Sequence, residues 1–337
     1  MSNRKNQTML NGALILSLAV ILVKIIGAIY KMPLTSLIGG VGRGYYNSAY
    51  EIYMPIYAIS MAGLPIAVAR MVSENVALNR YKEANKIFDV ALKMFILIGI
   101  VGTLIIVGVA FPYTKLIAGP KNLPAVLAIA PSLFFCSIMA VYRGYYEGLR
   151  NMKPTAISQV LEAFVKLVVG LSLAYLIVTL GLRQYNSGLA LANEALANGA
   201  AQIPDIFVFG VKVKDLSEAY SAIYPISASG AIFGVTSGTF LGAAYLFLKQ
   251  KLSAPAFTKE ELAQSPPASK GIEIAKSLIK VATPIILSSM VLSVTNLVDT
   301  LTIQSRLGHA LAKNPDIIKN MYATSLEAAK TLDSDIV

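Results

Sequence analysis

The residues best suited to binding chemistry are charged side chains within long apolar stretches of the chain. Lys24 and Lys31 stand seven residues apart in the first stretch, so a helix places them on one face, about 10 Å apart along its axis. Arg43 precedes the second stretch, and Glu51 lies within it. A charge in hydrocarbon costs roughly 2.5–3.5 kcal/mol on insertion scales and usually faces a partner or a wet cavity. These four residues therefore predict a polar, ligand-binding cavity.

The depths of these charges differ, which leaves two interpretations open. With the first apolar segment centred near residue 20, Lys24 lies about 6 Å from the midplane and Lys31 about 16 Å. Lys31 can extend to the headgroups, whereas Lys24 is deeper. Glu51 comes out at about 9 Å by the same measure. Either a Lys–Glu pair holds two helices together, or a cationic cavity has its charge tuned by Glu51.

Further charges occur in later apolar stretches. Arg143 lies in YRGYYEGLRNMKP at the end of the fourth, where it is either an interfacial anchor or part of a basic mouth for an anionic lipid headgroup. Glu162 and Lys166 are one helical turn apart, in the order that favours mutual neutralisation. Asp299 falls near the outer end of the last stretch, where interfacial placement accounts for it.

Glycines and prolines predict where these apolar stretches turn or break. The Gly-rich run beginning at Gly39 predicts a tight turn between the first two. Pro55, Gly63 and Pro65 predict that the second helix kinks or opens, as helices often do at transporter substrate sites. In the sixth stretch, glycines recur every fourth residue from 230 to 242, which predicts close packing against a neighbouring helix.

The composition identifies the class of protein. Hydrophobic residues make up 55% of the chain and charged residues 14%, whereas about a quarter of the residues of soluble domains are charged. This predicts an all-α polytopic membrane protein. A single cysteine, Cys136, allows neither an internal disulfide nor a cysteine-based metal site. Walker, HExxH and nucleophile-elbow motifs are missing, so neither an enzyme nor a cofactor or metal site is expected.

Seven segments are apolar and long enough to cross about 30 Å of hydrocarbon. They are residues 9–32, 45–71, 87–111, 123–142, 155–181, 219–248 and 276–301.

These segments predict two lobes. Residues 1–248 form a six-helix N-terminal lobe, residues 249–275 a polar linker, and residues 276–337 the start of a second lobe. No eighth apolar segment follows, so we expect a chain truncated at its C-terminus. Residues 182–218 are expected to form an outer loop, in which residues 188–197 make a short amphipathic helix on the membrane surface.

The net charge of +11 is distributed as in a membrane protein. Lys and Arg concentrate in alternate loops, which predicts a cytoplasmic N-terminus by the positive-inside rule. Basic residues are not gathered on one face, which argues against a nucleic-acid partner.

Three segments carry a family resemblance: KIIGAIYKMPLTSLIGGVGRGYYNSAYEIY, AGLPIAVARMVSE and YRGYYEGLRNMKPTAISQVLEAFVKL. They resemble the polysaccharide-biosynthesis and stage V sporulation protein B-like branch of the multidrug/oligosaccharidyl-lipid/polysaccharide exporter superfamily, which includes lipid II flippases. The resemblance implies two six-helix lobes around a cavity that opens alternately to each side. It also implies Lys24 as a cavity cation and Lys31 as a second.

The resemblance implies a bacterial cytoplasmic-membrane flippase. Its substrate would be an undecaprenyl-linked sugar, lipid II foremost, and membrane lipids and the cell-wall synthesis machinery would be its partners. Two alternatives stay open. A drug/cation antiporter of the same superfamily would need an acidic cavity, whereas lysines outnumber carboxylates in the first two segments. The other is a non-transporting membrane assembly subunit.

Overall fold

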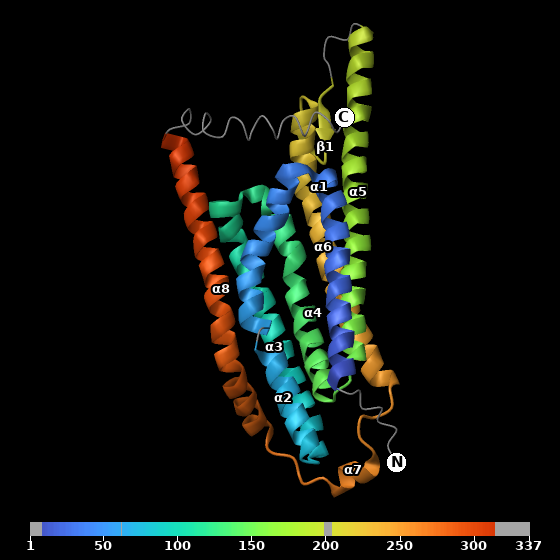
Figure 1. Ribbon diagram of the computed structural model, residues 1–337. Coiled ribbons are helices and arrows are strands. Elements are labelled where there is room, and N and C mark those ends of the chain that lie inside the picture. The colour runs from blue at the N-terminus through green and yellow to red at the C-terminus, as the bar shows by residue number, and fades with distance from the viewer. Residues whose placement is uncertain (1–8, 62, 199–203, 314–337) are drawn as a thin grey trace.

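The computed structural model describes residues 9–61, 63–198 and 204–313. The described chain is almost entirely helical, and its long helices run side by side along one axis (Figure 1). The helices are α1 (Met9–Met61), α2 (Leu64–Ala77), α3 (Tyr81–Tyr113), α4 (Leu123–Gly148), α5 (Lys153–Ala197), α6 (Leu216–Leu252), α7 (Lys259–Gln264) and α8 (Gly271–Lys313). Short π and 3₁₀ turns (Thr114–Ala118, Pro120–Asn122) join α3 to α4, and β1 (Ile206–Val208) pairs antiparallel with β2 (Val211–Val213).

The predicted all-α polytopic membrane fold is confirmed. Within the described residues, five helices are long and apolar enough to cross a membrane: α1, α3, α4, α5 and α6. One of them, α1, contains the first predicted span and most of the second. The seventh predicted span falls within α8, which is not among the five.

A single glycine reverses the direction of α1. Gly39 has φ 63° and ψ −178°, a backbone conformation open almost only to glycine. The chain folds back there (Figure 1), and the rings of Tyr30 and Tyr46 lie 6.4 Å apart across the hairpin. We call residues 9–38 the first limb and residues 40–61 the second limb. The end of the bundle near Gly39 is the turn end, and the end near α7 is the linker end.

The predicted break in the second span is confirmed. Helix α1 ends at Met61 and α2 begins at Leu64, with Pro65 in its first turn, where a missing N–H costs no hydrogen bond. Gly63 is needed for packing, because a Cβ there would lie 2.5 Å from the Ala282 carbonyl oxygen of α8. Helix α8 therefore crosses at the break.

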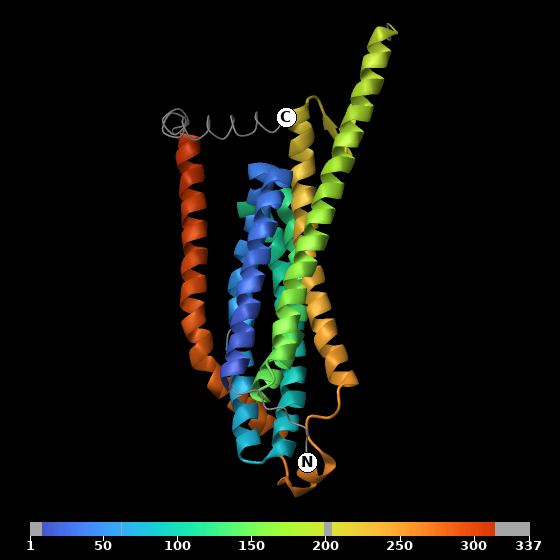
Figure 2. The same ribbon diagram turned by 45° about the vertical axis from the view of Figure 1, so that its right-hand side comes forward.

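The structure corrects the predicted outer loop. Helix α5 runs unbroken from Lys153 to Ala197, so residues 182–197 continue it instead of forming a separate surface helix. At about 67 Å, α5 is more than twice as long as the hydrocarbon is thick, and it projects beyond the turn end of the bundle (Figure 2). The β1–β2 ribbon stabilises this projection, because Tyr185 is buried in a small cluster with Ile206 and Val208.

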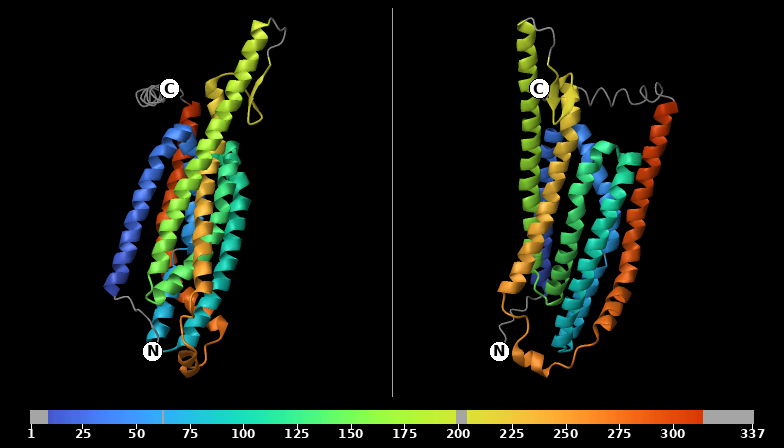
Figure 3. Two further views of the ribbon diagram at one scale, coloured as in Figure 1. Left: turned by 90° about the vertical axis from the view of Figure 1, so that its right-hand side faces the viewer. Right: turned by 180° about the vertical axis from the view of Figure 1, so that it is seen from behind.

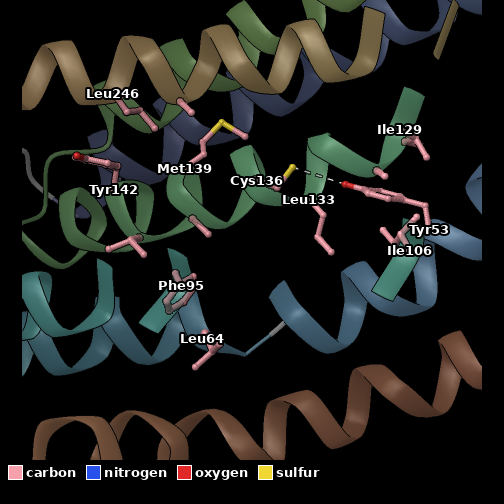
Figure 4. Close-up of a cluster of buried hydrophobic side chains, with 14 of the residues drawn as sticks. Tyr53, Leu64, Phe95, Ile106, Ile129, Leu133, Cys136, Met139, Tyr142 and Leu246 are labelled. Atoms are coloured by element: carbon pink, nitrogen blue, oxygen red, sulfur yellow. Dashed lines mark hydrogen bonds between the residues drawn. The ribbon is translucent and has the colours of Figure 1, made fainter. Parts of the chain in front are cut away.

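The main core lies among α1, α2, α3, α4 and α6, and the start of α8 packs against it. Its buried side chains gather around α4, where Cys136 lies beside Tyr53 of the second limb and Met139 points toward α6 (Figure 4).

Helices α5 and α6 lie side by side (Figure 3) and approach closely along the predicted glycine stripe. A Cβ on Gly234 would lie 2.5 Å from the Gly170 Cα, and one on Gly238 would lie 2.5 Å from the Glu162 carbonyl oxygen. The stripe thus serves packing, as predicted.

Replacing Gly234 with Ala should separate α5 from α6, because the new methyl group would collide with backbone. We expect Gly234→Ala to lower the free energy of unfolding by about 1–3 kcal/mol, measured by denaturant unfolding in detergent micelles. Gly108→Ala is the matched control, since no atom lies within 4 Å of its added Cβ. Equal stability of the two variants would contradict the packing role.

Candidate functional site

An ion pair joins α4 to α5 inside the bundle. The Arg143 Nη2 atom lies 2.9 Å from Glu162 Oε2, and Arg143 Nε donates to Ser158 Oγ at 2.9 Å. The two charged side chains are only 19% and 29% exposed. Because each charge is matched by the other, losing either partner leaves an uncompensated charge between the helices.

Lys166 of α5 lies among tyrosines. Its ammonium donates to the Tyr50 hydroxyl at 3.0 Å and lies 5.3 Å from the Tyr30 ring centre and 5.4 Å from that of Tyr50. Because Tyr30 belongs to the first limb and Tyr50 to the second, this cation–π cluster ties the hairpin to α5.

The sequence predicted that Glu162 and Lys166 neutralise each other within one helix, and the structure corrects this prediction. Glu162 instead reaches across to Arg143 on α4, and among the described residues no carboxylate lies within ion-pair distance of Lys166. The choice of partner depends on which helices flank α5, and spacing along one helix cannot reveal that.

A ladder of tyrosines, absent from our sequence-based predictions, follows one face of the second limb. Successive rings of Tyr46, Tyr50, Tyr53 and Tyr57 are 5.1, 6.1 and 5.5 Å apart. Tyr30 extends the ladder into the first limb and donates a hydrogen bond of 3.2 Å to the Ala231 carbonyl of α6. The spacing of the four residues by four, three and four positions is the signal that could have revealed this face.

Lys24 and Lys31 are both exposed on the first limb. Ser17 and Thr35 are also exposed, and their spacing places all four residues on one side of the helix. We call Ser17, Lys24, Lys31 and Thr35 the polar stripe. The Thr35 hydroxyl bonds to the Lys31 carbonyl. Most of the remaining surface of this limb is exposed and apolar.

Arg43 and Glu51 have partners near the turn end. The Arg43 guanidinium lies 5.7 Å from the Tyr46 ring centre. Glu51 Oε2 accepts a weak hydrogen bond of 3.5 Å from Tyr113, whose hydroxyl also donates to the Ser48 carbonyl at 3.0 Å.

The structure does not bring Lys24 and Glu51 together as an ion pair. In the described part of the chain, ion pairs form only between Arg143 and Glu162 and between Lys212 and Asp205. The static Lys–Glu pair considered above is thus not formed in this conformation. Asp299 lies in α8, but its side chain is outside the described residues, as is all of the tail 314–337.

Metal-binding clusters of three or more His, Cys, Asp or Glu residues are not found where the chain is described. Cys136 is buried, with its Sγ 3.7 Å from the Tyr53 hydroxyl. The arrangement therefore offers a set of interior charges that join helices and an exposed polar stripe that carries two lysines.

Comparison with known proteins finds relatives over the N-terminal part of the chain. The polysaccharide biosynthesis protein family matches residues 9–203. Three similar proteins come from Bacillus subtilis (strain 168): the uncharacterized membrane protein YabM (29% identity, 60% of this chain), the lipid II flippase MurJ (26%, 55%) and stage V sporulation protein B (28%, 62%). The matched regions cover 37%, 35% and 39% of those proteins, so the chain spans well under half of their length.

One solved structure shares the fold. It is the inward-facing conformation of a multidrug resistance MATE family transporter of the MOP superfamily, with a TM-score of 0.54 over 85% of this chain and 57% of that one. At 13% identity this likeness concerns the fold alone.

Removing the negative charge of Glu162, the partner of Arg143, should destabilise the helix bundle. We expect Glu162→Gln to lower the free energy of unfolding by about 3 kcal/mol, because Arg143 is left charged and unpaired between helices. The double variant Arg143→Met/Glu162→Met should recover most of this loss, and denaturant unfolding in detergent measures both.

The exposed pair Lys212–Asp205, with side chains 55% and 49% exposed, is the matched control. Asp205→Asn should cost less than about 1 kcal/mol. Similar losses for Glu162→Gln and Asp205→Asn would refute the special role of the interior pair.

Proposed function

Because the chain belongs to the polysaccharide biosynthesis protein family, we propose that it acts as a flippase or exporter in the bacterial cytoplasmic membrane. Its proposed substrate is an undecaprenyl-linked cell-wall or polysaccharide precursor. Lipid II is the first substrate to test, since one relative is a lipid II flippase. Membrane lipids surround the protein, and the enzymes of cell-wall synthesis are its proposed functional partners.

The observation that carries this proposal is the polar stripe on the first limb. Lys24 is exposed within an otherwise apolar helix and has no carboxylate partner among the described residues. Left against lipid, such a cation would be unstable, and an aqueous cavity with an anionic ligand would stabilise it. The diphosphate of a lipid-linked sugar supplies two negative groups of the kind that lysine binds.

The stripe also suggests a route across the membrane. From the linker end toward the turn end, the order is Ser17, Lys24, Lys31 and Thr35, and Arg43 follows beyond the turn. In the proposed alternating-access cycle, the diphosphate enters from the linker end and is held by Lys24. It then passes toward Lys31 while the prenyl tail stays in lipid. Glu51, held near the turn end, would limit the positive charge there.

The proposed orientation puts the linker end in the cytoplasm. Exposed lysines gather on this end, namely Lys249, Lys251, Lys259, Lys270 and Lys276. This distribution matches the positive-inside rule and supports the proposal that the N-terminus is cytoplasmic.

The interior charges have a different proposed role. Arg143 was a candidate for a basic mouth, but Glu162 and Ser158 occupy its guanidinium. We therefore assign Arg143, Glu162 and Lys166 to holding the helices together rather than to contact with substrate.

A drug/cation antiporter is the second candidate, and the first limb argues against it. Residues 9–38 include two lysines and no acidic residue, so this wall would repel a cationic drug. The remaining candidate, a non-transporting assembly subunit, predicts no effect of the polar stripe on the distribution of any lipid-linked precursor.

Replacing Lys24 tests the proposed site. We expect Lys24→Met to fold normally but to reduce transport at least about tenfold, because one charge-assisted hydrogen bond to phosphate contributes about 1.5–3 kcal/mol. The measurement is the fraction of lipid II whose headgroup is accessible to an external probe, in cells depleted of their own flippases. Lys24→Arg should retain activity, and Lys93→Met, at an exposed position on α3, is the charge-matched control.

Three outcomes would overturn the proposal in different ways. Unchanged transport by a well-folded Lys24→Met variant would remove Lys24 from the site. Failure of the unaltered protein to move lipid II, with export of a cationic dye instead, would favour the antiporter. Failure to move either compound would favour the assembly subunit.

A further inference from the structure

The first turn of α3 lacks a cap from its own sequence neighbours. Its N-cap residue is Arg80, whose side chain makes no capping hydrogen bond. The first backbone N–H groups of any helix have no partner within that helix, so they need acceptors from elsewhere. In α3, such an acceptor comes from the segment between α6 and α8.

Ser265 supplies this cap from 183 residues away. Its hydroxyl accepts a hydrogen bond of 3.0 Å from the backbone N–H of Lys82, the second residue of α3. The Lys82 ammonium donates a second bond, also 3.0 Å, to the Ser265 carbonyl. Ser265 is only 4% exposed, so both bonds are shielded from competing water.

Two more contacts fix the same segment to the neighbouring residues of α3. Before α7, the buried Phe257 packs its ring 5.0 Å from that of Tyr81. Just before α8, the Ser269 backbone N–H donates to Glu83 Oε2 at 2.6 Å. Three consecutive residues of α3 thus hold three separate points of the segment.

The segment itself has an ordered centre. Helix α7 carries a capping box in which Thr258 and Glu261 bond to each other's backbone N–H groups at 3.2 and 2.8 Å. Helix α7 lies across the linker end of the bundle, beside the ends of α2 and α3 (Figure 1).

The attachments also position the start of α8. Ile274, Leu278 and Ala282 are buried against the bundle. Beyond Pro284, the described side chains include Leu287 and Val291, which are 58% and 66% exposed. Among the described side chains of α8, the fully buried ones therefore lie next to the attached segment.

We propose that residues 253–270 form a strap. The strap caps α3 from a distant part of the same chain and holds the first turns of α8 against α2 and α3, so that these parts move as one body. The strap is a conformational device and does not depend on the proposed substrate. It predicts that loss of the Ser265 hydroxyl loosens two places distant in sequence, namely the first turn of α3 and the start of α8.

Hydrogen–deuterium exchange tests the strap in the whole protein in lipid nanodiscs, without substrate. We expect Ser265→Ala to speed amide exchange about fivefold in peptides covering residues 81–86 and 271–278, as loss of one helix cap implies. Exchange in the middle of α4 should not change, which distinguishes local loosening from general destabilisation.

Ser269→Ala is the matched control, because Ser269 bonds to Glu83 through its backbone and its side chain is not needed for that bond. This variant should exchange like the unaltered protein. Unchanged exchange at residues 81–86 in Ser265→Ala would disprove the cap that Ser265 gives α3. Faster exchange there without any change at residues 271–278 would show a cap that does not hold α8, and would overturn the strap.

Discussion

Ionised side chains inside an apolar helix bundle need partners, and this constraint determines how the central helices assemble. Arg143 and Glu162 bind each other across α4 and α5, while Lys166 reaches past them to Tyr50 and the ring of Tyr30. Through these contacts α5 is joined to α4 on one side and to both limbs of α1 on the other. The glycine stripe of α6 packs closely against α5, which joins α6 to the same group of helices.

The same constraint separates Lys24 from the interior charges. Arg143 and Glu162 neutralise each other, and Lys166 is held by the Tyr50 hydroxyl and two tyrosine rings, so all three have contacts within the bundle. Lys24 lies on the uncovered face of the first limb and is without a carboxylate partner in the described chain. We propose that its counter-charge is the anionic headgroup of a substrate, which fits the family to which the chain belongs.

Features governed by local chemistry were predictable from the sequence. The turn at Gly39, the break before Leu64 and the close approach of α6 each depend on glycine or proline at a particular position. The partner of Glu162 was not predictable, because Arg143 becomes its neighbour only when α4 and α5 pack. The extension of α5 and the cap that Ser265 gives α3 likewise depend on segments brought together by folding. The roles of Lys24, Lys31, Arg43 and Glu51 in binding remain predictions, as does the division into lobes.

The proposed site requires that Lys24 is exposed to water, and cysteine accessibility measures this exposure. The native Cys136 is buried and should contribute little background. In membranes, Lys24→Cys should react with a charged, membrane-impermeant thiol reagent, whereas Leu22→Cys, on the opposite side of the same helix, should not. Protection of Cys at position 24 by added lipid II would place the substrate there. If both positions are equally unreactive, Lys24 faces lipid or protein, and the account of an aqueous, anion-binding path along the first limb is wrong.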